Sequence, residues 1–143
     1  MRQKTVLEVA FRLQIDVRTV VADRMHALDT NFSQMHMRAL RAIWSADNVT
    51  SQHIVSILKR DKAQVTRLVN ELVELNLVYR EQNPNDKRSK LLKLTKEGAN
   101  IFRQIEDIEK DVVKDMLKGI ETEDLETFFN VADQISENIR LME

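Results

Sequence analysis

The chain has 143 residues, a net charge of −1 and no cysteine, and 43% of its residues are hydrophobic while 31% are charged. This composition excludes a disordered chain, and the lack of thiols excludes disulfides, thiolate metal sites and thiol-based redox sensing. The first twenty residues carry charges throughout, and no run of 18 apolar residues occurs. We therefore expect a cytoplasmic protein with no secretory or membrane segment.

Charge is distributed unevenly along the chain. Residues 1–45 and 46–98 each carry a net charge of +3, whereas residues 99–143 carry −7. This asymmetry predicts that a polyanion would meet the first two thirds of the chain. Ordinary variation between solvated helices explains the same pattern, so charge alone does not decide the matter.

Helices should dominate, because two glycines and one proline leave few positions for tight turns. The first is a long helix that fades near Leu28 and breaks at residues 29–31. Its apolar residues recur at spacings of three and four, which is the period of an amphipathic helix. They are Val6, Val9, Leu13, Val17, Val20 and Val21.

Two shorter helices follow, each with a hydroxyl residue as its N-cap. Ser33 begins the second helix and Thr50 the third, and a hydrophobic staple brackets each cap. The staple pairs are Phe32 with Met37 and Val49 with Ile54. The predicted buried positions are Met37, Leu40, Ile43 and Trp44 in the second helix, and Ile54, Ile57 and Leu58 in the third.

A fourth helix is predicted from Lys62 to Leu75. Asp61 is its N-cap, and Gln64 at the third helical position completes a capping-box-like pair. Only a few residues separate it from the third helix, and two short helices joined this closely are typical of a helix-turn-helix. Its predicted apolar side consists of Val65, Leu68, Val69, Leu72 and Leu75.

A β-hairpin is predicted next. Asn76 can adopt the left-handed conformation that ends a helix. Residues 77–80 and 91–94 are the predicted strands, and the Asn-Pro-Asn-Asp sequence at 83–86 is the strongest turn signal in the chain. The sequence therefore predicts a hairpin with a polar, basic tip.

Two further helices complete the chain. Thr95 should cap a long helix that Gly119 ends, and Thr122 should cap the last helix. The predicted core positions of the former are Ile101, Phe102, Ile105, Ile108, Val112 and Met116, and the latter carries the apolar residues Leu125, Phe128, Phe129, Ala132, Ile135 and Ile139. The fold class is mainly α with a small β-hairpin.

The fourth helix has a polar side opposite its apolar side. Glutamine, asparagine and arginine make bidentate hydrogen bonds to base edges in the major groove, and alanine or a threonine methyl group can contact a thymine methyl group. Such residues in the first turns are typical of a recognition helix. A solvated polar face is the alternative interpretation. The residues concerned are Ala63, Gln64, Thr66, Arg67 and Asn70.

The hairpin tip places three cations within four positions, at Lys87, Arg88 and Lys90. Cations on a hairpin beside a helix-turn-helix can contact phosphates or enter a minor groove. Asp86 would orient Arg88, because a carboxylate can fix a guanidinium group. A basic hairpin tip alone is usually only solvated, so the combination in this order is what indicates DNA binding.

In this order the motifs resemble those of the MarR family of regulators. They are Leu72 with Asn76-Leu77-Val78-Tyr79-Arg80, then Pro84-Asn85-Asp86-Lys87-Arg88, then Leu94-Thr95-Lys96-Glu97-Gly98. Asn76 stands where that family usually has glycine, and asparagine tolerates the same backbone angles. The resemblance covers essentially the whole chain and implies a winged helix-turn-helix flanked by N- and C-terminal dimerisation helices.

The resemblance also implies roles for individual residues. Lys62 would join Gln64, Thr66, Arg67 and Asn70 in facing the major groove. Ser51 and Gln52 would contact phosphate at a helix N-terminus, where backbone N–H groups favour an anion. Arg88 would enter the minor groove with Asp86 holding it, and Lys87 and Lys90 would contact phosphates.

A homodimer on a palindromic operator is a further implication of the resemblance. Residues 1–30 and 99–143 would form dimerisation helices around a DNA-binding lobe at residues 31–98, in one continuous domain. Packing of the terminal helices within one subunit is the alternative. The expected dimer contacts are Val6, Leu13, Val17, Ile105, Ile108, Val112, Phe128, Ile135 and Ile139.

The predicted function is that of a bacterial transcription regulator, a repressor by the usual mode of the family, which a small-molecule effector could release from double-stranded DNA. Segments that could line an effector cleft hold Met25, His26, Phe32, His36 and Trp44, although core packing and surface histidines also explain these residues. The alternative function is a helical dimeric protein-interaction module without DNA binding.

Catalysis is not expected. The sequence has no glycine-rich phosphate loop, cysteine nucleophile or local serine-histidine-aspartate motif. His26, His36 and His53 lie in separate segments without metal-ligand spacing, so neither a metal nor another cofactor is predicted.

Overall fold

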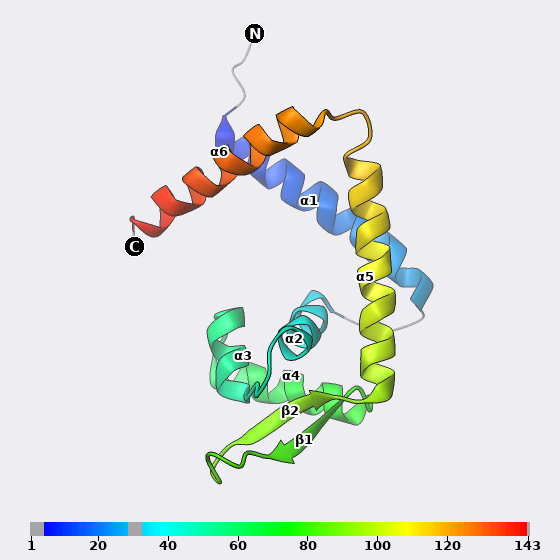
Figure 1. Ribbon diagram of the computed structural model, residues 1–143, viewed down its shortest axis with the longest axis vertical. Helices are drawn as coiled ribbons and strands as arrows, with labels where there is room; N and C mark the ends of the chain where they lie inside the picture. The colour runs from blue at the N-terminus through cyan, green and yellow to red at the C-terminus, as the bar shows by residue number, and fades with distance from the viewer. Residues whose placement is uncertain (1–4, 29–32, 143) are drawn as a thin grey trace. The chain divides into compact units, whose positions relative to one another are not determined.

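The structure, a computed structural model, describes residues 5–28 and 33–142 (Figure 1). It divides into two compact units, Met1–Lys110 and Asp111–Glu143. Among the described residues, none of the helices combines the length and the apolar character that crossing a membrane requires. In chain order the elements are α1 (Val6–Met25), the 3-10 helix η1 (His26–Leu28), α2 (Gln34–Ser45), α3 (Ser51–Leu58), α4 (Lys62–Glu74), β1 (Val78–Gln82), β2 (Lys90–Leu94), α5 (Lys96–Met116) and α6 (Thr122–Arg140).

Side-chain caps fix where most of these helices begin. Ser33, Thr50 and Asp61 each accept a hydrogen bond from the backbone N–H three residues later, which confirms the three predicted N-caps. Thr95 does the same for α5, through a 2.9 Å bond from the N–H of Gly98 to its Oγ1. For Asp61 the bond comes from the Gln64 N–H at 2.8 Å, which is one half of the predicted reciprocal pair.

The cap predicted for α6 is wrong. Glu121 is the N-cap residue and makes no side-chain cap hydrogen bond, while Thr122 is already the first helical residue. Its hydroxyl position looked like a cap signal because threonine is common there. In this helix the acidic residues of the first turn, Glu123 and Asp124, interact favourably with the helix dipole instead.

The core of the first unit joins α2, α3 and α4 to the hairpin and to the first turns of α5. Val49 and Ile54 are both buried, as the predicted staple requires, whereas the Phe32 half of the other staple lies outside the described residues. The fully buried side chains include Leu40, Ile54, Val65, Val69, Leu72, Val78, Leu92, Phe102 and Ile105.

Three residues predicted to be buried are exposed, as is Leu75 on the predicted apolar side of the fourth helix. Trp44 stacks on Phe102 with ring centroids 5.2 Å apart but leaves 42% of its surface open. Ile57, Leu75 and Met116 lie in the last turn of a helix or just after it, where fewer neighbours cover a side chain, and each is about half exposed. The helical period identifies the apolar side of each helix, but it does not tell how far the neighbouring elements extend to cover that side.

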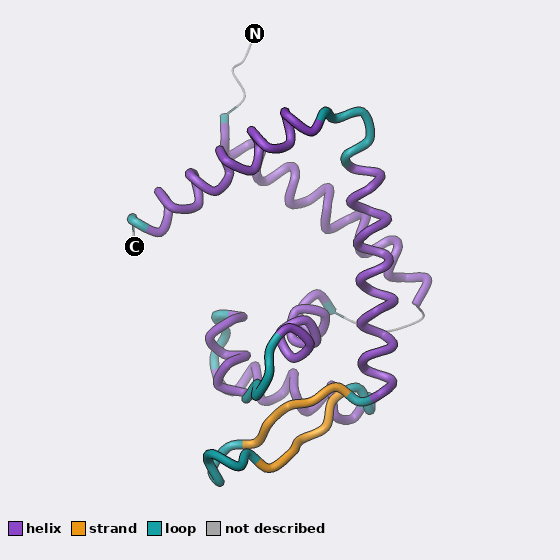
Figure 2. Tube along the Cα trace, in the orientation of Figure 1, coloured by secondary structure: helices purple, strands orange, loops and turns teal. Residues whose placement is uncertain are grey.

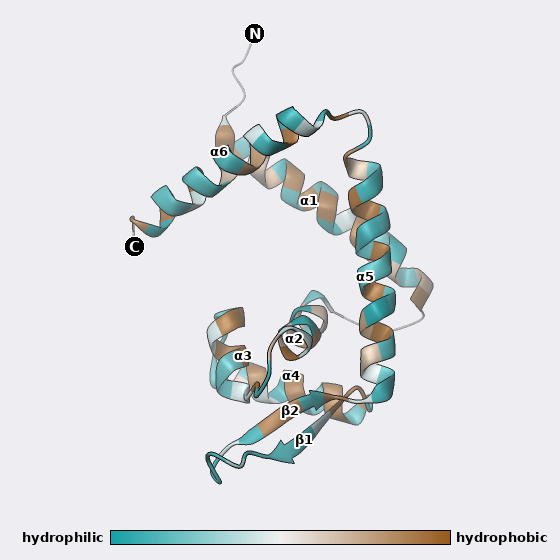
Figure 3. Ribbon diagram, in the orientation of Figure 1, coloured by the Kyte–Doolittle hydropathy of each residue, from teal (hydrophilic) through white to brown (hydrophobic). Residues whose placement is uncertain are grey.

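The hairpin pairs β1 with β2 in antiparallel register, from Val78 opposite Leu94 to Gln82 opposite Lys90. Figure 3 shows that β1 is hydrophilic over most of its length, whereas β2 carries a hydrophobic segment. That segment contains Leu91 and Leu92, both buried. The hairpin therefore lies on the core through β2 and through Val78 of β1, and presents the rest of β1 to solvent.

A backbone hydrogen bond joins the hairpin to the helix-turn-helix. The Leu92 N–H donates to the carbonyl of Val49, at 2.7 Å, in the loop that leads from α2 to α3 (Figure 2). Val49 immediately precedes the cap of α3. The wing and the helix-turn-helix are thus parts of one hydrogen-bonded body.

The start of α5 is fixed to the end of α4 by a close backbone approach. Asn76 has a φ of 59°, as predicted for the helix end, and its carbonyl accepts from the Thr95 hydroxyl at 2.7 Å. The Leu77 carbonyl accepts from the Thr95 N–H at 3.0 Å. A Cβ added at Gly98 would lie 2.0 Å from that carbonyl oxygen. This geometry gives a physical reason for the Leu-Thr-x-x-Gly sequence: threonine bridges the junction and only glycine fits beneath it.

Candidate nucleic-acid interface

One side of α4 is buried and the other is open to solvent. Val65, Leu68, Val69 and Leu72 pack into the core. The opposite side carries the six residues predicted to face DNA, and all six are exposed in the structure: Lys62, Ala63, Gln64, Thr66, Arg67 and Asn70. The structure therefore brings the candidate base-reading residues together on one helix face.

The hydroxyl of Thr66 does not point away from α4. Its Oγ1 donates to the carbonyl of Lys62 at 2.8 Å, one turn earlier in the same helix. Because this bond occupies the hydroxyl proton, the methyl group is the part of the side chain best suited to an apolar contact, such as one with a thymine methyl group.

Glu71, a residue the sequence analysis did not single out, lies beside this face. Its Oε2 is 2.7 Å from Nε2 of His36, and its Oε1 is 4.0 Å from Nε of Arg67. The Nδ1 atom of His36 accepts from the backbone N–H of Ser33 at 3.0 Å, as part of the α2 capping box. His36 therefore connects the first turn of α2 to the residue that borders Arg67.

A second unpredicted contact reaches the face from the hairpin. Nη2 of Arg80, in β1, donates to Oδ1 of Asn70. Both side chains belong to exposed residues. The sequence contained one signal for this pair, the arginine that ends the Leu-Val-Tyr-Arg strand, but nothing in it specified Asn70 as the partner.

The N-terminus of α3 forms the second part of the interface. Ser51 is its first residue and is partly exposed, and Gln52 is exposed. Thr50 caps the helix in a box with His53, whose Nδ1 accepts from the Thr50 N–H at 3.1 Å. Free N–H groups in this first turn favour an anion, which suits the predicted phosphate contact.

The wing tip is held by hydrogen bonds among its own polar residues. The Asn83 amide donates to the Ser89 hydroxyl at 2.9 Å, and the Asp86 carboxylate accepts from the backbone N–H of Arg88 at 2.9 Å. We expected the carboxylate to fix the Arg88 guanidinium group; the bond that the structure shows goes to the Arg88 backbone instead. Asp86 thus shapes the turn that presents the exposed residues Lys87, Arg88 and Lys90.

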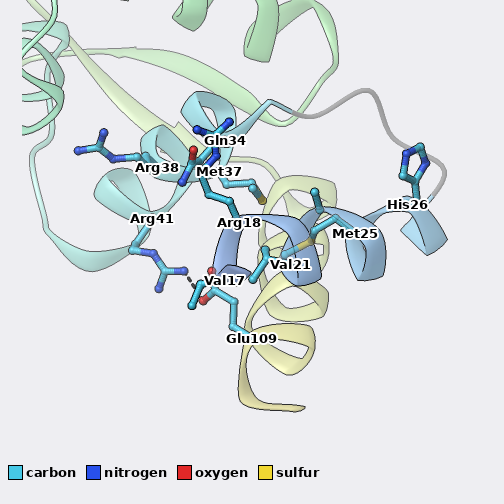
Figure 4. Close-up of a pocket in the computed structure, with 11 residues that line it drawn as sticks. Val17, Arg18, Val21, Met25, His26, Gln34, Met37, Arg38, Arg41 and Glu109 are labelled. Atoms are coloured by element: carbon cyan, nitrogen blue, oxygen red, sulfur yellow. Dashed lines mark hydrogen bonds and ion pairs between the residues drawn. The ribbon is translucent and has the colours of Figure 1, made fainter. Parts of the chain in front are cut away.

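A cavity of about 560 Å³ lies in the first unit, between α1, α2 and Glu109 of α5 (Figure 4). Of the residues in segments that could line an effector cleft, Met25 and His26 line this cavity, Trp44 and His36 do not, and Phe32 lies outside the described residues. Its walls combine apolar and cationic groups, namely Val17, Val21, Ala22, Met25 and Met37 with Arg18, Arg38 and Arg41. Arg41 forms an ion pair with Glu109.

The residues predicted for dimer contacts differ in exposure within one chain. Ile105 is fully buried in the core of the first unit and Val112 is buried as well, so these two side chains have no surface left for a partner. Ile108 is partly buried. The other six keep between 36% and 64% of their surface exposed: Val6, Leu13, Val17, Phe128, Ile135 and Ile139.

Histidine and carboxylate side chains do not gather into a metal site in the described part of the chain, where no group of three or more potential ligands is arranged to hold an ion. His36 and His53 instead have structural partners at the starts of α2 and α3.

Comparison with known proteins agrees with this arrangement. The sequence model of the MarR family matches residues 30–89, which cover the helix-turn-helix and most of the wing. The HTH-type transcriptional regulator YdgJ of Bacillus subtilis (strain 168) is 26% identical over 136 residues, 95% of this chain and 82% of that protein. The multiple antibiotic resistance protein MarR of Escherichia coli (strain K12) is 32% identical over 91 residues, 63% of each chain.

Solved structures show the same fold over nearly the full length. A cysteine-to-serine mutant of MarR from E. coli superposes with a TM-score of 0.78 at 22% identity, covering 94% of this chain and 98% of that one. A glycine-to-lysine mutant of MepR from S. aureus gives 0.79 at 17% identity, covering 95% and 99%. The helix-turn-helix and most of the wing thus match the model of the MarR family, and the chain is similar in sequence to the regulators YdgJ and MarR and in fold to solved structures of MarR and MepR.

Proposed function

We propose that this protein binds a specific palindromic operator as a homodimer and represses transcription there. One observation carries the proposal: α4 buries its apolar side in the core and presents six small or polar side chains beside a basic hairpin of the same lobe. A helix of this kind fits the major groove, and a basic hairpin next to it fits the adjoining minor groove.

Each part of the interface has its own task. The exposed face of α4 reads base edges, the first turn of α3 with Ser51 and Gln52 contacts phosphate, and Arg88 enters the minor groove. Lys87 and Lys90 add phosphate contacts, so binding should weaken as salt rises. Binding to chromosomal DNA would place the protein in the bacterial cytoplasm.

Two-fold symmetric DNA calls for a two-fold symmetric protein. The exposed apolar residues of α1 and α6, such as Leu13 and Phe128, are suited to burial against a second copy, because large open apolar surfaces are rare on monomers. We assign residues 1–30 and 99–143 to dimerisation and residues 31–98 to the DNA-binding lobe. Ile105 supports these helices from inside its own chain.

A small-molecule effector is the proposed means of release. The cavity between α1 and α2 combines apolar walls with Arg18, Arg38 and Arg41, which suits a small aromatic anion. Since α2 also carries His36, which contacts Glu71 of α4, a ligand against α2 would act on the helix that reads DNA.

Fluorescence anisotropy tests the proposal on the intact protein. The labelled duplexes are the DNA upstream of its own gene, a scrambled duplex of the same composition, and duplexes selected from random DNA, each at two salt concentrations. We expect two subunits to bind a specific duplex, with affinity falling as salt rises. Absence of binding to any duplex at low salt would contradict the proposal and favour a protein-interaction module.

A further inference from the structure

The contact between Arg80 and Asn70 limits what the recognition helix can read. Asn70 lies on the exposed face of α4, in its third turn, and Arg80 lies in β1. Nη2 of Arg80 donates to Oδ1 of Asn70. A guanidinium group has only donors, so the amide atom that it meets must be the oxygen, and the orientation of the amide follows from chemistry alone.

This orientation affects the hydrogen-bonding edge that Asn70 offers to DNA. An asparagine that reads adenine uses both ends of its amide, because its oxygen accepts from adenine N6 while its nitrogen donates to N7. In this protein the oxygen already accepts from Arg80, and a cation stands beside it. One lone pair of the oxygen remains, but a base donor there would lie beside the Arg80 cation, whereas the amide nitrogen keeps two protons and no competing partner in this contact.

The amide nitrogen of Asn70, a donor beside the Arg80 cation, is complementary to a base edge that carries hydrogen-bond acceptors. Guanine presents two acceptors in the major groove, N7 and O6, whereas adenine presents N7 beside the N6 donor group. The N6 donor group of adenine would share the Asn70 oxygen with Arg80 and would face the positive charge of the guanidinium group. The pair therefore disfavours adenine and favours guanine.

We propose that Arg80 is a positioning residue that turns Asn70 from an adenine reader into a guanine reader. The proposal rests on the proposed function, in which α4 enters the major groove. It requires no DNA contact by Arg80 itself, because the effect of Arg80 passes through the amide of Asn70.

The experiment is a selection of bound duplexes from random DNA, sequenced for the full-length wild type and for variants. The base preference that disappears in Asn70→Ala identifies the operator position that Asn70 reads. We expect guanine at that position in the wild-type operator. Arg80→Ala should lower the guanine-to-adenine ratio there about fivefold or more, since good base contacts discriminate by about this factor. The other positions should keep their preferences.

Further variants separate positioning from folding. Arg80→Lys keeps a donor beside the Asn70 oxygen and should retain part of the guanine preference. Asn70→Asp keeps the contact with Arg80 as an ion pair but removes the amide donor, so it should fold and still lose guanine. Arg80→Ala added to Asn70→Ala should change this position no further. Glu81→Ala, an exposed neighbour in β1, is the matched control and should leave the preference unchanged.

Three results would overturn the inference while leaving the proposed function intact. They are a wild-type preference for adenine at the Asn70 position, a guanine preference that survives Arg80→Ala, and no position that depends on Asn70. If the wild type selects no sequence at all, the proposed function itself fails.

Discussion

Nε2 of His36 lies 2.7 Å from Oε2 of Glu71, which joins the first turn of α2 to the third turn of α4 across 35 residues of sequence. Because the Ser33 N–H donates to Nδ1, Nε2 is the ring nitrogen placed to donate to the carboxylate. Both ring nitrogens thus have a partner, one in the α2 capping box and one in α4.

His36→Ala should lower the free energy of unfolding by about 1–3 kcal/mol, because it removes half of a capping box and a hydrogen bond to a charged group. Urea unfolding measures this. His53→Ala is the matched control, because His53 forms the same box with Thr50 on α3, and its loss should cost only about 1 kcal/mol. Equal losses in the two variants would show that the Glu71 contact contributes nothing to stability.

Gly98→Ala should destabilise the fold by about 1–3 kcal/mol or more, because the new Cβ would lie against the Leu77 carbonyl oxygen and force the α4–β1 junction away from α5. Thermal unfolding reports the change. Gly119→Ala serves as the comparison: it has open space around it but a φ of 77°, so only the backbone conformation is penalised, by about 1–2 kcal/mol. A Gly98→Ala variant as stable as wild type would contradict the close approach.

Asp86→Asn should keep DNA binding close to the wild-type level, because an amide oxygen can accept from the Arg88 N–H as the carboxylate does. Asp86→Ala should weaken binding by loosening the turn, and Arg88→Ala should weaken it by about 1–3 kcal/mol. Fluorescence anisotropy titrations on one selected operator measure the affinities of the three variants and of the wild type. If Asp86→Asn loses as much affinity as Asp86→Ala, the carboxylate charge acts directly, for example on the Arg88 side chain.

Ala22→Phe should abolish the response to effectors without weakening operator binding, because the new ring would occupy the cavity beside Met25 and Met37. The assay is release of labelled operator by a panel of small aromatic carboxylates. Asp23→Phe carries the same ring one position along α1, outside the cavity lining, and should still respond. Release of the operator from Ala22→Phe at wild-type ligand concentrations would place the effector elsewhere.

Local sequence signals predicted most of the elements. The caps at Ser33, Thr50, Asp61 and Thr95 and the left-handed Asn76 depend on residues at most a few positions apart, which is why they could be recognised without a structure. The exposed polar side of α4 followed in the same way from the helical period.

The contacts that connect the elements could not be predicted in this way. His36 with Glu71 and Arg80 with Asn70 are pairs that meet only after the helices and the hairpin have packed, and many other polar pairs were equally plausible from the sequence. The burial predicted for Trp44 was wrong for a related reason, because the apolar stripe of α2 does not reveal how much of the Trp44 side chain α5 covers.

The hydrogen bond between Leu92 and Val49 ties the wing to the loop before α3, and so to the helix-turn-helix of the same lobe. If α4 and the wing bind DNA as proposed, they cannot move independently along it, and the spacing of the bases that they contact would be set by the fold of a single lobe. One inserted base pair between the α4 contact and the wing contact would put the two out of phase.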